Sequence, residues 1–330
     1  MTTRRKILLS LGFGTLSVAI PSLAQQSAKV PRVAFLGAGS PKSSGTLFDK
    51  FRKGLHDLGY IEGKNIVIDV RWAEGNTERL PGLAAELIVL KPNVIVGNAP
   101  AVRAVKQLTN TIPIVMTSVA DPVGFGWITS LAHPGGNITG MSTAGDLDMD
   151  LKRVQLLRSV APKATRIANL WQPPTDPTRH PQTIKKFQDG AQTLGVTLLP
   201  VSANTPEEFN GAFAMIAKLK ATAIIVGNYI VFSVHRKEIA ELAAEHRLPA
   251  IYSSGEYVEA GGLLSYGVNG EYLHEHAATF VDKILKGAKP SDLPVEQATK
   301  FEMVVNMKTA KAMGITIPQE ILLRADRVIE

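Results

Sequence analysis

The chain has 330 residues, of which 45% are hydrophobic and 20% are charged, with 28 glycines, 20 prolines and no cysteine. This composition is that of a globular protein with room for two ordinary domains, and it excludes disordered and fibrous classes. The 36 lysines and arginines exceed the 29 acids by 7. No run of basic and aromatic residues accompanies that excess beyond the N-terminus, so we expect no nucleic-acid partner.

The first 24 residues predict an export signal. A basic start at 4–6 precedes an apolar stretch at 7–20, and small residues at 22 and 24 suit cleavage after Ala24. The paired arginines leave both a Sec and a twin-arginine route open. Because the chain has no cysteine, disulfides, thiolate metal sites and a lipid anchor on cysteine are excluded. We therefore expect a free protein in the periplasm that is not a lipoprotein.

Short apolar runs predict the strands, and the amphipathic stretches between them predict helices. The predicted strands are Val33–Leu36, Ile66–Trp72, Val94–Gly97, Ile114–Ser118, Ile138–Met141, Arg166–Trp171, Thr197–Val201, Ala223–Gly227, Ala250–Tyr252, Leu263–Gly267 and Glu302–Asn306. Runs of four to six apolar residues that alternate with helices are typical of parallel strands buried on both faces. The sequence therefore predicts a doubly wound α/β architecture.

One pattern occurs twice along the chain. Leu-Gly ends a predicted helix at 58–59 and again at 194–195, and Ile-Val-Gly-Asn follows at 95–98 and at 225–228. A chance likeness between two βαβ units is the alternative, but the shared order favours two similar lobes. If the lobes face one another, the two Gly-Asn loops lie across a cleft, because ligands bind beyond the carboxyl ends of parallel strands.

Four stretches of the sequence resemble a known family. They are 54–65 (GLHDLGYIEGKN), 112–140 (IPIVMTSVADPVGFGWITSLAHPGGNITG), 261–267 (GGLLSYG) and 294–330. The chain resembles exported substrate-binding proteins of ABC transporters, in the group with tryptophan- and tyrosine-binding members, from about residue 31 to the end. The resemblance implies the type I periplasmic binding fold, with two doubly wound parallel-sheet lobes joined by a three-crossing hinge.

The resemblance also implies domain boundaries and a function. The signal would occupy 1–24, the first lobe 30–143 plus 267–293, and the second lobe 144–266 plus 294–330, with crossings near 141–145, 265–269 and 294–299. The implied function is that of a monomeric periplasmic receptor, which captures a small ligand such as an aromatic or branched amino acid. It then delivers that ligand to an ABC permease in the inner membrane. A periplasmic module that senses ligand for a membrane receptor is the alternative.

The predicted ligand site consists of loops that follow the strands. A ligand carboxylate favours amides at a helix start and hydroxyl groups, an ammonium favours acids, and an aromatic side chain favours rings. In the first lobe the candidates are Ser40, Asn98, Ala99, Ser118 and Asp121. In the second lobe they are Trp171, Asn228, Tyr229, Tyr252 and Glu256.

Several candidates have a purely structural alternative. Asp121 either contacts the ligand or caps the turn at 123–131, and Ser118 either contacts the ligand or bonds a neighbouring loop. Glu256 is either a cleft acid or a solvated surface acid. The loop at 171–174, Trp-Gln-Pro-Pro, departs from the Asn-Pro turn that relatives tend to have, which puts direct transfer of a relative's ligand in doubt.

No catalytic residue, cofactor or metal is expected. Gly37 and Gly39 begin a dinucleotide fingerprint, but Lys42 stands where its third glycine belongs. The sequence contains no Walker motif and no Gly-x-Ser-x-Gly elbow. His274 and His276 stand two residues apart on a predicted helix, where they point to different faces and form a poor zinc site. The sequence therefore predicts a binding protein and not an enzyme.

Overall fold

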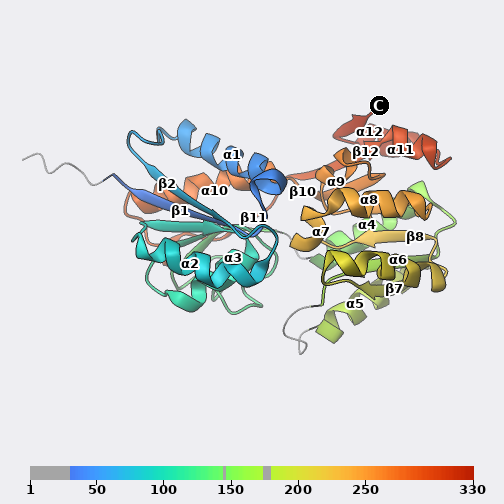
Figure 1. The fold of residues 1–330 in the computed structure, drawn as a ribbon, viewed down its shortest axis with the longest axis horizontal. Helices are drawn as coiled ribbons and strands as arrows, with labels where there is room; N and C mark the ends of the chain where they lie inside the picture. Colours follow the sequence, from blue (N-terminus) through green and yellow to red (C-terminus); the bar gives the residue numbers. More distant parts are fainter. Residues whose placement is uncertain (1–29, 144–145, 174–179) are drawn as a thin grey trace, which may run out of the picture. The chain divides into compact units, whose positions relative to one another are not determined.

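Two sheets with helices on both faces organise the chain (Figure 1). The structure is a computed structural model, and it describes residues 30–143, 146–173 and 180–330. The predicted signal at 1–24 and the end of the first predicted crossing, 144–145, lie outside the described residues. Residues Pro31–Glu330 belong to one compact unit.

The first sheet has six strands, and all of its pairs are parallel. In spatial order they are β2 (Val67–Trp72), β1 (Arg32–Gly37), β3 (Val94–Gly97), β4 (Ile114–Val119), β5 (Ile138–Ser142) and β11 (Glu296–Gln297). Alternate residues enter different cores, since Val33 and Phe35 belong to one apolar cluster and Ala34 and Leu36 to another. This sheet and its helices are called the first lobe below.

Four helices cover the first sheet. Residues of α1 (Pro41–Asp57) and α10 (Gly270–Leu285) complete the cluster on one face, and those of α2 (Leu80–Val89) and α3 (Ala99–Leu108) complete the cluster on the other. Two short 3-10 helices, η1 (Thr77–Arg79) and η3 (Pro290–Asp292), lie in the connections. Burial on both faces explains why β1, β3 and β4 read as continuous apolar runs.

The second sheet has seven strands and one antiparallel pair, β10 with β12. In spatial order they are β13 (Arg327–Ile329), β12 (Phe301–Asn306), β10 (Leu264–Val268), β9 (Ala250–Tyr252), β8 (Ala223–Val226), β6 (Arg166–Trp171) and β7 (Thr197–Ser202). The antiparallel pair arises because the chain returns to this sheet from the first one. This sheet and its helices are called the second lobe.

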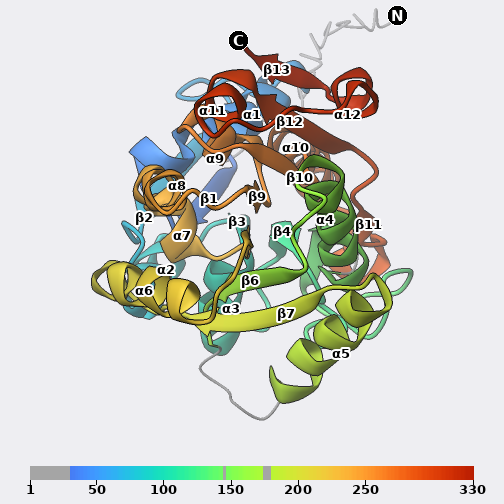
Figure 2. The ribbon, with the colours of Figure 1, turned by 90° about the vertical axis from the view of Figure 1, so that its right-hand side faces the viewer.

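Helices also cover both faces of the second sheet, and Figure 2 shows α4 and α5 on the opposite side of β6 and β7 from α6 and α8. One apolar cluster contains residues of α4 (Asp146–Val160), α5 (His180–Thr193), α11 (Met307–Ala312) and α12 (Gln319–Arg324). The other contains residues of α6 (Phe209–Lys218), α7 (Ile230–Val234), α8 (Arg236–Glu245) and α9 (Gly255–Glu259). The 3-10 helix η2 (Pro206–Glu208) precedes α6.

Every predicted strand is present, and its ends lie within one residue of the prediction. The strands β11 and β13 were not predicted. The pairing of β11 with β5 places 296–297 in the first sheet, whereas the sequence assigned 294–330 to the second lobe. The reason is that two residues can form a parallel pair without any apolar run that would show in the sequence. The remaining lobe boundaries stay predictions.

The chain passes between the two sheets three times, after β5, after β10 and after β11. Hydrogen bonds tie these passages to one another. The amide of Ala298 donates to the carbonyl of Ser142 at 2.8 Å, and the amide of Asn269 donates to the carbonyl of Lys300 at 3.0 Å. The buried Arg153 of α4 donates from Nε to the carbonyl of Tyr266 at 2.8 Å. The hinge is therefore a bundle of interlocked backbone segments.

One of the two histidines excluded above as a zinc site, His274, lies inside the first lobe. Its side chain is 7% exposed, and its Nδ1–H donates to the carbonyl of Gly270 at 2.8 Å. Burial disfavours the charged imidazolium and lowers the pKa of His274 to about 4. The ring is therefore neutral in the folded protein at pH values where an unfolded chain already protonates it.

This difference predicts how stability depends on pH. Between pH 6.5 and 4 the unfolded chain binds a proton at His274 that the folded chain does not, so stability falls as the pH falls. We expect the free energy of unfolding to decrease over this interval by on the order of 3 kcal/mol more in the wild type than in His274→Asn. Urea unfolding at several pH values measures the difference. The control His56→Asn, at an exposed histidine, should follow the wild type, and equal slopes in all three proteins would contradict the prediction.

Candidate functional site

Three predicted ligand residues follow neighbouring strands of the first sheet. Ser40 follows β1, Asn98 follows β3, and Ser118 lies near the end of β4. Because β1, β3 and β4 are adjacent and parallel, the structure brings these residues to one edge of the sheet, where two helices also begin. This carboxyl edge is the usual ligand-binding edge of such a sheet.

Ser40 caps the first of these helices, α1. The amide of Ser43 donates to Oγ of Ser40 at 3.1 Å, and the amide of Ser40 donates to Oγ of Ser43 at 2.9 Å. The first turn of α1 contains no acid. The two serines therefore leave the positive end of the helix dipole without a compensating charge.

Asn98 stands at the cap position of α3, yet its side chain caps nothing. Its Oδ1 is buried and has no hydrogen-bond partner. The helix begins at Ala99, continues with Pro100, and has no acid in its first turn. The first amides of a helix lack intrahelical partners. The start of α3 therefore offers backbone N–H donors beside the unpartnered acceptor Oδ1 of Asn98.

The end of β4 is irregular. Its pairing with β5 shifts between Met116 and Val119, which is the sign of a bulge. Ser118 is half-buried there, whereas Thr117 is fully buried and its Oγ1 has no partner. Bulges often re-aim side chains next to functional sites. Thr117 was missed by the sequence analysis, because nothing in an apolar run indicates where a bulge falls.

Asp121 is exposed, and its role in the structure is local. Its Oδ1 accepts from the amide of Gly124 at 2.7 Å, so the carboxylate caps the turn that follows β4. A Cβ at Gly124 would lie 1.9 Å from Oδ2 of Asp121, so a larger residue there would displace the capping carboxylate. Of the two alternatives left open for Asp121, the observed contact is the cap.

The second lobe places three candidates at the ends of its strands. Trp171 ends β6 and is half-buried, Asn228 follows β8 and is exposed, and half-buried Tyr229 precedes α7. The ring of Tyr229 packs edge-on against Phe232, with the centroids 5.4 Å apart. The adjacent strands β6 and β8 thus carry aromatic surface at their carboxyl edge.

Tyr252 was predicted to face the ligand, and the structure corrects this. Its side chain is fully buried in the core of the second lobe, where the ring stacks on Tyr257 at 4.9 Å and 14°. This burial raises the pKa of its hydroxyl by desolvation. The physical reason is that Gly255–Glu259 form the helix α9, which packs Tyr257 against the ring of Tyr252, whereas the sequence predicts that a loop containing Glu256 follows this strand.

Glu256 lies in the first turn of α9 and is half-buried. Burial is the main cause that raises the pKa of its carboxyl, whereas the charge of Arg236 lowers that pKa and the charges of Glu259 and Glu271 raise it. Glu256 is therefore not a fully solvated acid. The positive charge of Arg236 opposes the effect of burial on Glu256. Arg236 was not among the predicted site residues, because an arginine at the start of an amphipathic helix is usually exposed to solvent.

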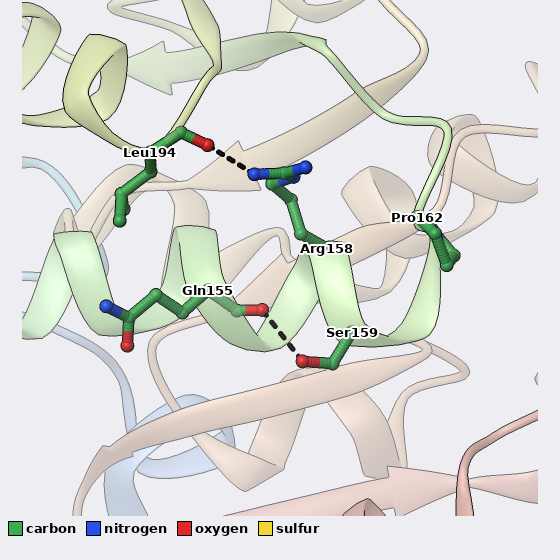
Figure 3. A pocket seen from close by; sticks show the side chains of 5 residues that line it. All are labelled: Gln155, Arg158, Ser159, Pro162 and Leu194. Atoms are coloured by element: carbon green, nitrogen blue, oxygen red, sulfur yellow. Dashed lines mark hydrogen bonds between the residues drawn. The ribbon is translucent and has the colours of Figure 1, made fainter.

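Two small surface hollows lie elsewhere. Figure 3 shows the first, on α4, where the guanidinium of Arg158 donates to the carbonyl of Leu194 and Oγ of Ser159 donates to the carbonyl of Gln155. The second lies between the end of α8 and α11, and Arg247 and Lys308 are among its lining residues. None of the predicted ligand residues lines either hollow.

Within residues 30–143, 146–173 and 180–330, no group of three or more His, Cys, Asp or Glu side chains could hold a metal ion. Over the same described residues, no helix combines the length and apolar character that a membrane crossing needs.

Comparison with known proteins agrees with this geometry. The family model described as ABC transporter substrate binding protein matches residues 42–329. The tyrosine-binding protein of Clostridioides difficile (strain R20291) is 29% identical over 267 residues, which cover 80% of this chain and 75% of that protein.

Two solved structures are similar over 91% of the chain. An ABC domain from Streptococcus pneumonia in complex with L-Trp is 26% identical, with 99% of that chain covered and a TM-score of 0.83. The ligand-free, open structure of a substrate binding protein with adhesive properties from Clostridium difficile is 25% identical, with 99% covered and a TM-score of 0.67. The two-lobe architecture is the type I periplasmic binding fold, and the chain belongs to the substrate-binding proteins of ABC transporters, a family of solute-binding proteins and not of enzymes.

Proposed function

We propose that this protein is the solute receptor of an ABC importer and that it binds an amino acid, with an aromatic side chain preferred, between its two lobes. One observation carries the proposal: the carboxyl edge of the first sheet combines two acid-free helix starts, at α1 and α3, with the unpartnered Oδ1 of Asn98. Similarity to proteins that bind tyrosine and L-Trp supports the ligand class.

The chemistry of that edge suits both charged groups of an amino acid. A carboxylate is stabilised by backbone amides at the start of α3, where the helix dipole is positive. An adjacent ammonium can donate to Oδ1 of Asn98, which otherwise stays buried without a partner at a cost of about 1–3 kcal/mol. A sugar or a nucleobase has no such pair of opposite charges.

The second lobe supplies complementary surface. Trp171 and Tyr229 offer ring faces for an apolar or aromatic side chain, and Glu256 offers a carboxylate in a partly desolvated place. Ser40, Ala99, Ser118 and Asn228 remain in the proposed site as contacts from neighbouring loops. Tyr252 leaves it, because its side chain is buried in the core, and we propose that Asp121 acts only as the cap of its turn.

The proposal also includes the setting. Export through residues 1–24 would bring the mature chain to the periplasm as a free monomer, and the loaded protein would deliver its ligand to an inner-membrane ABC permease. Because transport needs a docking partner and sensing needs a receptor, the two roles separate experimentally. We expect proteoliposomes that contain the permease and ATPase of the cognate importer to accumulate labelled tyrosine only when this protein is added. Binding without uptake would favour the sensing role.

A ligand screen tests the binding function directly. We expect L-tyrosine and L-tryptophan to raise the melting temperature of the mature protein by on the order of 5 °C at a hundredfold excess over Kd, because ligand binds only the folded state. Tyramine, which lacks the carboxylate, and N-acetyl-tyrosine, which lacks the ammonium, should give no shift. The absence of a shift with every aromatic and branched amino acid would refute the ligand class.

Asn98→Ala tests the observation that carries the proposal. Removing Oδ1 should weaken binding of the responding amino acid about tenfold, since a hydrogen bond to a charged group is lost. The ligand-free variant should be at least as stable as the wild type, because the Asn98 side chain makes no capping bond and its unpartnered oxygen is removed. Isothermal titration calorimetry measures the affinity, and chemical unfolding measures the stability.

Asp121→Ala is the matched comparison for this experiment. It removes a cap and should lower stability by about 1 kcal/mol while leaving affinity within about twofold of wild type. If Asp121→Ala loses affinity and Asn98→Ala keeps it, then Asp121 and not Asn98 contacts the ligand.

A further inference from the structure

A short segment of the second lobe, Ile230–Arg236, makes several contacts with the first lobe. It comprises α7, His235 and the first residue of α8, and it directly follows Asn228 and Tyr229 of the proposed ligand site. Ile230 is partly buried against the apolar cluster that contains α2 and α3 of the first lobe. The segment therefore connects the ligand loop of one lobe to the core of the other.

A second contact joins Val234 to Gly75. Gly75 lies in the connection between β2 and η1 and has φ +81°, a conformation that favours glycine. A Cβ at this position would lie 3.3 Å from Cγ2 of Val234, so the valine packs directly on the backbone of the first lobe. Ile230 and Val234 are four residues apart on α7 and therefore share one face of that helix.

The third contact is polar. Nη1 of Arg236 donates to the carbonyl of Ser233 at 2.8 Å within the segment, and it lies 3.5 Å from the carbonyl of Ser43 in the first lobe. The bond to Ser233 orients the guanidinium. The contact with Ser43 is at the distance limit of a hydrogen bond and contributes little as it stands. Ser43 is also the residue whose amide and hydroxyl complete the Ser40 cap of α1. Arg236 thus points at the helix start that the first lobe offers to the ligand.

We infer that Ile230–Arg236 is a clamp that stabilises the closed arrangement of the lobes, with Arg236 as its positioning residue. The apolar pair holds the segment on the first lobe, and closure shortens the contact between Arg236 and Ser43 into a full hydrogen bond. A ligand that draws the two lobes together gains this bond as well as its own contacts. The clamp rests on the proposed two-lobe capture but not on the identity of the ligand.

The clamp predicts a change that can be measured without any ligand. The chain has no cysteine, so Lys64→Cys in the first lobe and Lys218→Cys in the second allow two dyes to be attached at exposed sites. We expect Arg236→Gln to shift the distribution of inter-dye distances in the ligand-free protein toward longer values, because the closed arrangement loses a contact. The conservative Arg236→Lys keeps the charge and should restore part of the closed population.

The matched control is Lys237→Gln. It removes the same charge from the neighbouring residue, which is exposed and pairs with Glu241 of its own helix at 3.7 Å. This variant should keep the wild-type distance distribution. For the amino acid that responds in the ligand screen, Arg236→Gln should weaken binding about fivefold through the reduced closed population, and Lys237→Gln should not.

The outcomes separate the clamp from the proposed function. Identical ligand-free distributions for wild type, Arg236→Gln and Lys237→Gln would overturn the clamp, whatever the protein binds. Equal shifts in both glutamine variants would also overturn it, because the effect would then be one of net charge. If no amino acid binds but Arg236→Gln still opens the ligand-free protein, the clamp stands and only the proposed ligand class fails.

Discussion

The fold depends on the interlocking of its three passages between the sheets. Two of the bonds that hold them join main-chain groups, Ala298 to Ser142 and Asn269 to Lys300, and the third joins a buried arginine to a main-chain carbonyl. Main-chain bonds of this kind fix the distance between segments but leave their dihedral angles some freedom. The two lobes have largely separate apolar clusters, so these passages are the covalent connection about which we propose that the lobes move.

The two lobes meet the proposed ligand with different chemistry. The first presents helix starts and a buried amide oxygen, which are fixed by the backbone and need little rearrangement when a charged ligand arrives. The second presents aromatic rings and the pair Glu256 and Arg236, whose charges act on one another. Each lobe offers only part of the complement of an amino acid, so the proposed ligand would need contacts from both lobes. A ligand that contacts both lobes at once would therefore stabilise the arrangement in which the lobes are close together.

Most of the fold was readable from the sequence, and the site only in part. Strands such as Val94–Gly97 are buried on both faces, so their residues form apolar runs whose ends are sharp. The bulge beside Thr117 and the pairing of β11 leave no such run, because they depend on register between distant segments. Tyr252 was assigned to the wrong surface because α9 covers it, and a five-residue helix has too weak a pattern to be seen.

The position of Arg236 shows why closure and recognition are hard to separate in such a protein. Its guanidinium lies within range of the α1 cap through Ser43, and its charge also lowers the pKa of Glu256. A ligand ammonium placed beside Glu256 would weaken the pull of that carboxylate on Arg236 and leave the guanidinium freer to bond across the lobes. Ligand charge and lobe contact would then change together through one side chain. Affinity would depend on the closed population as much as on the contacts with the ligand.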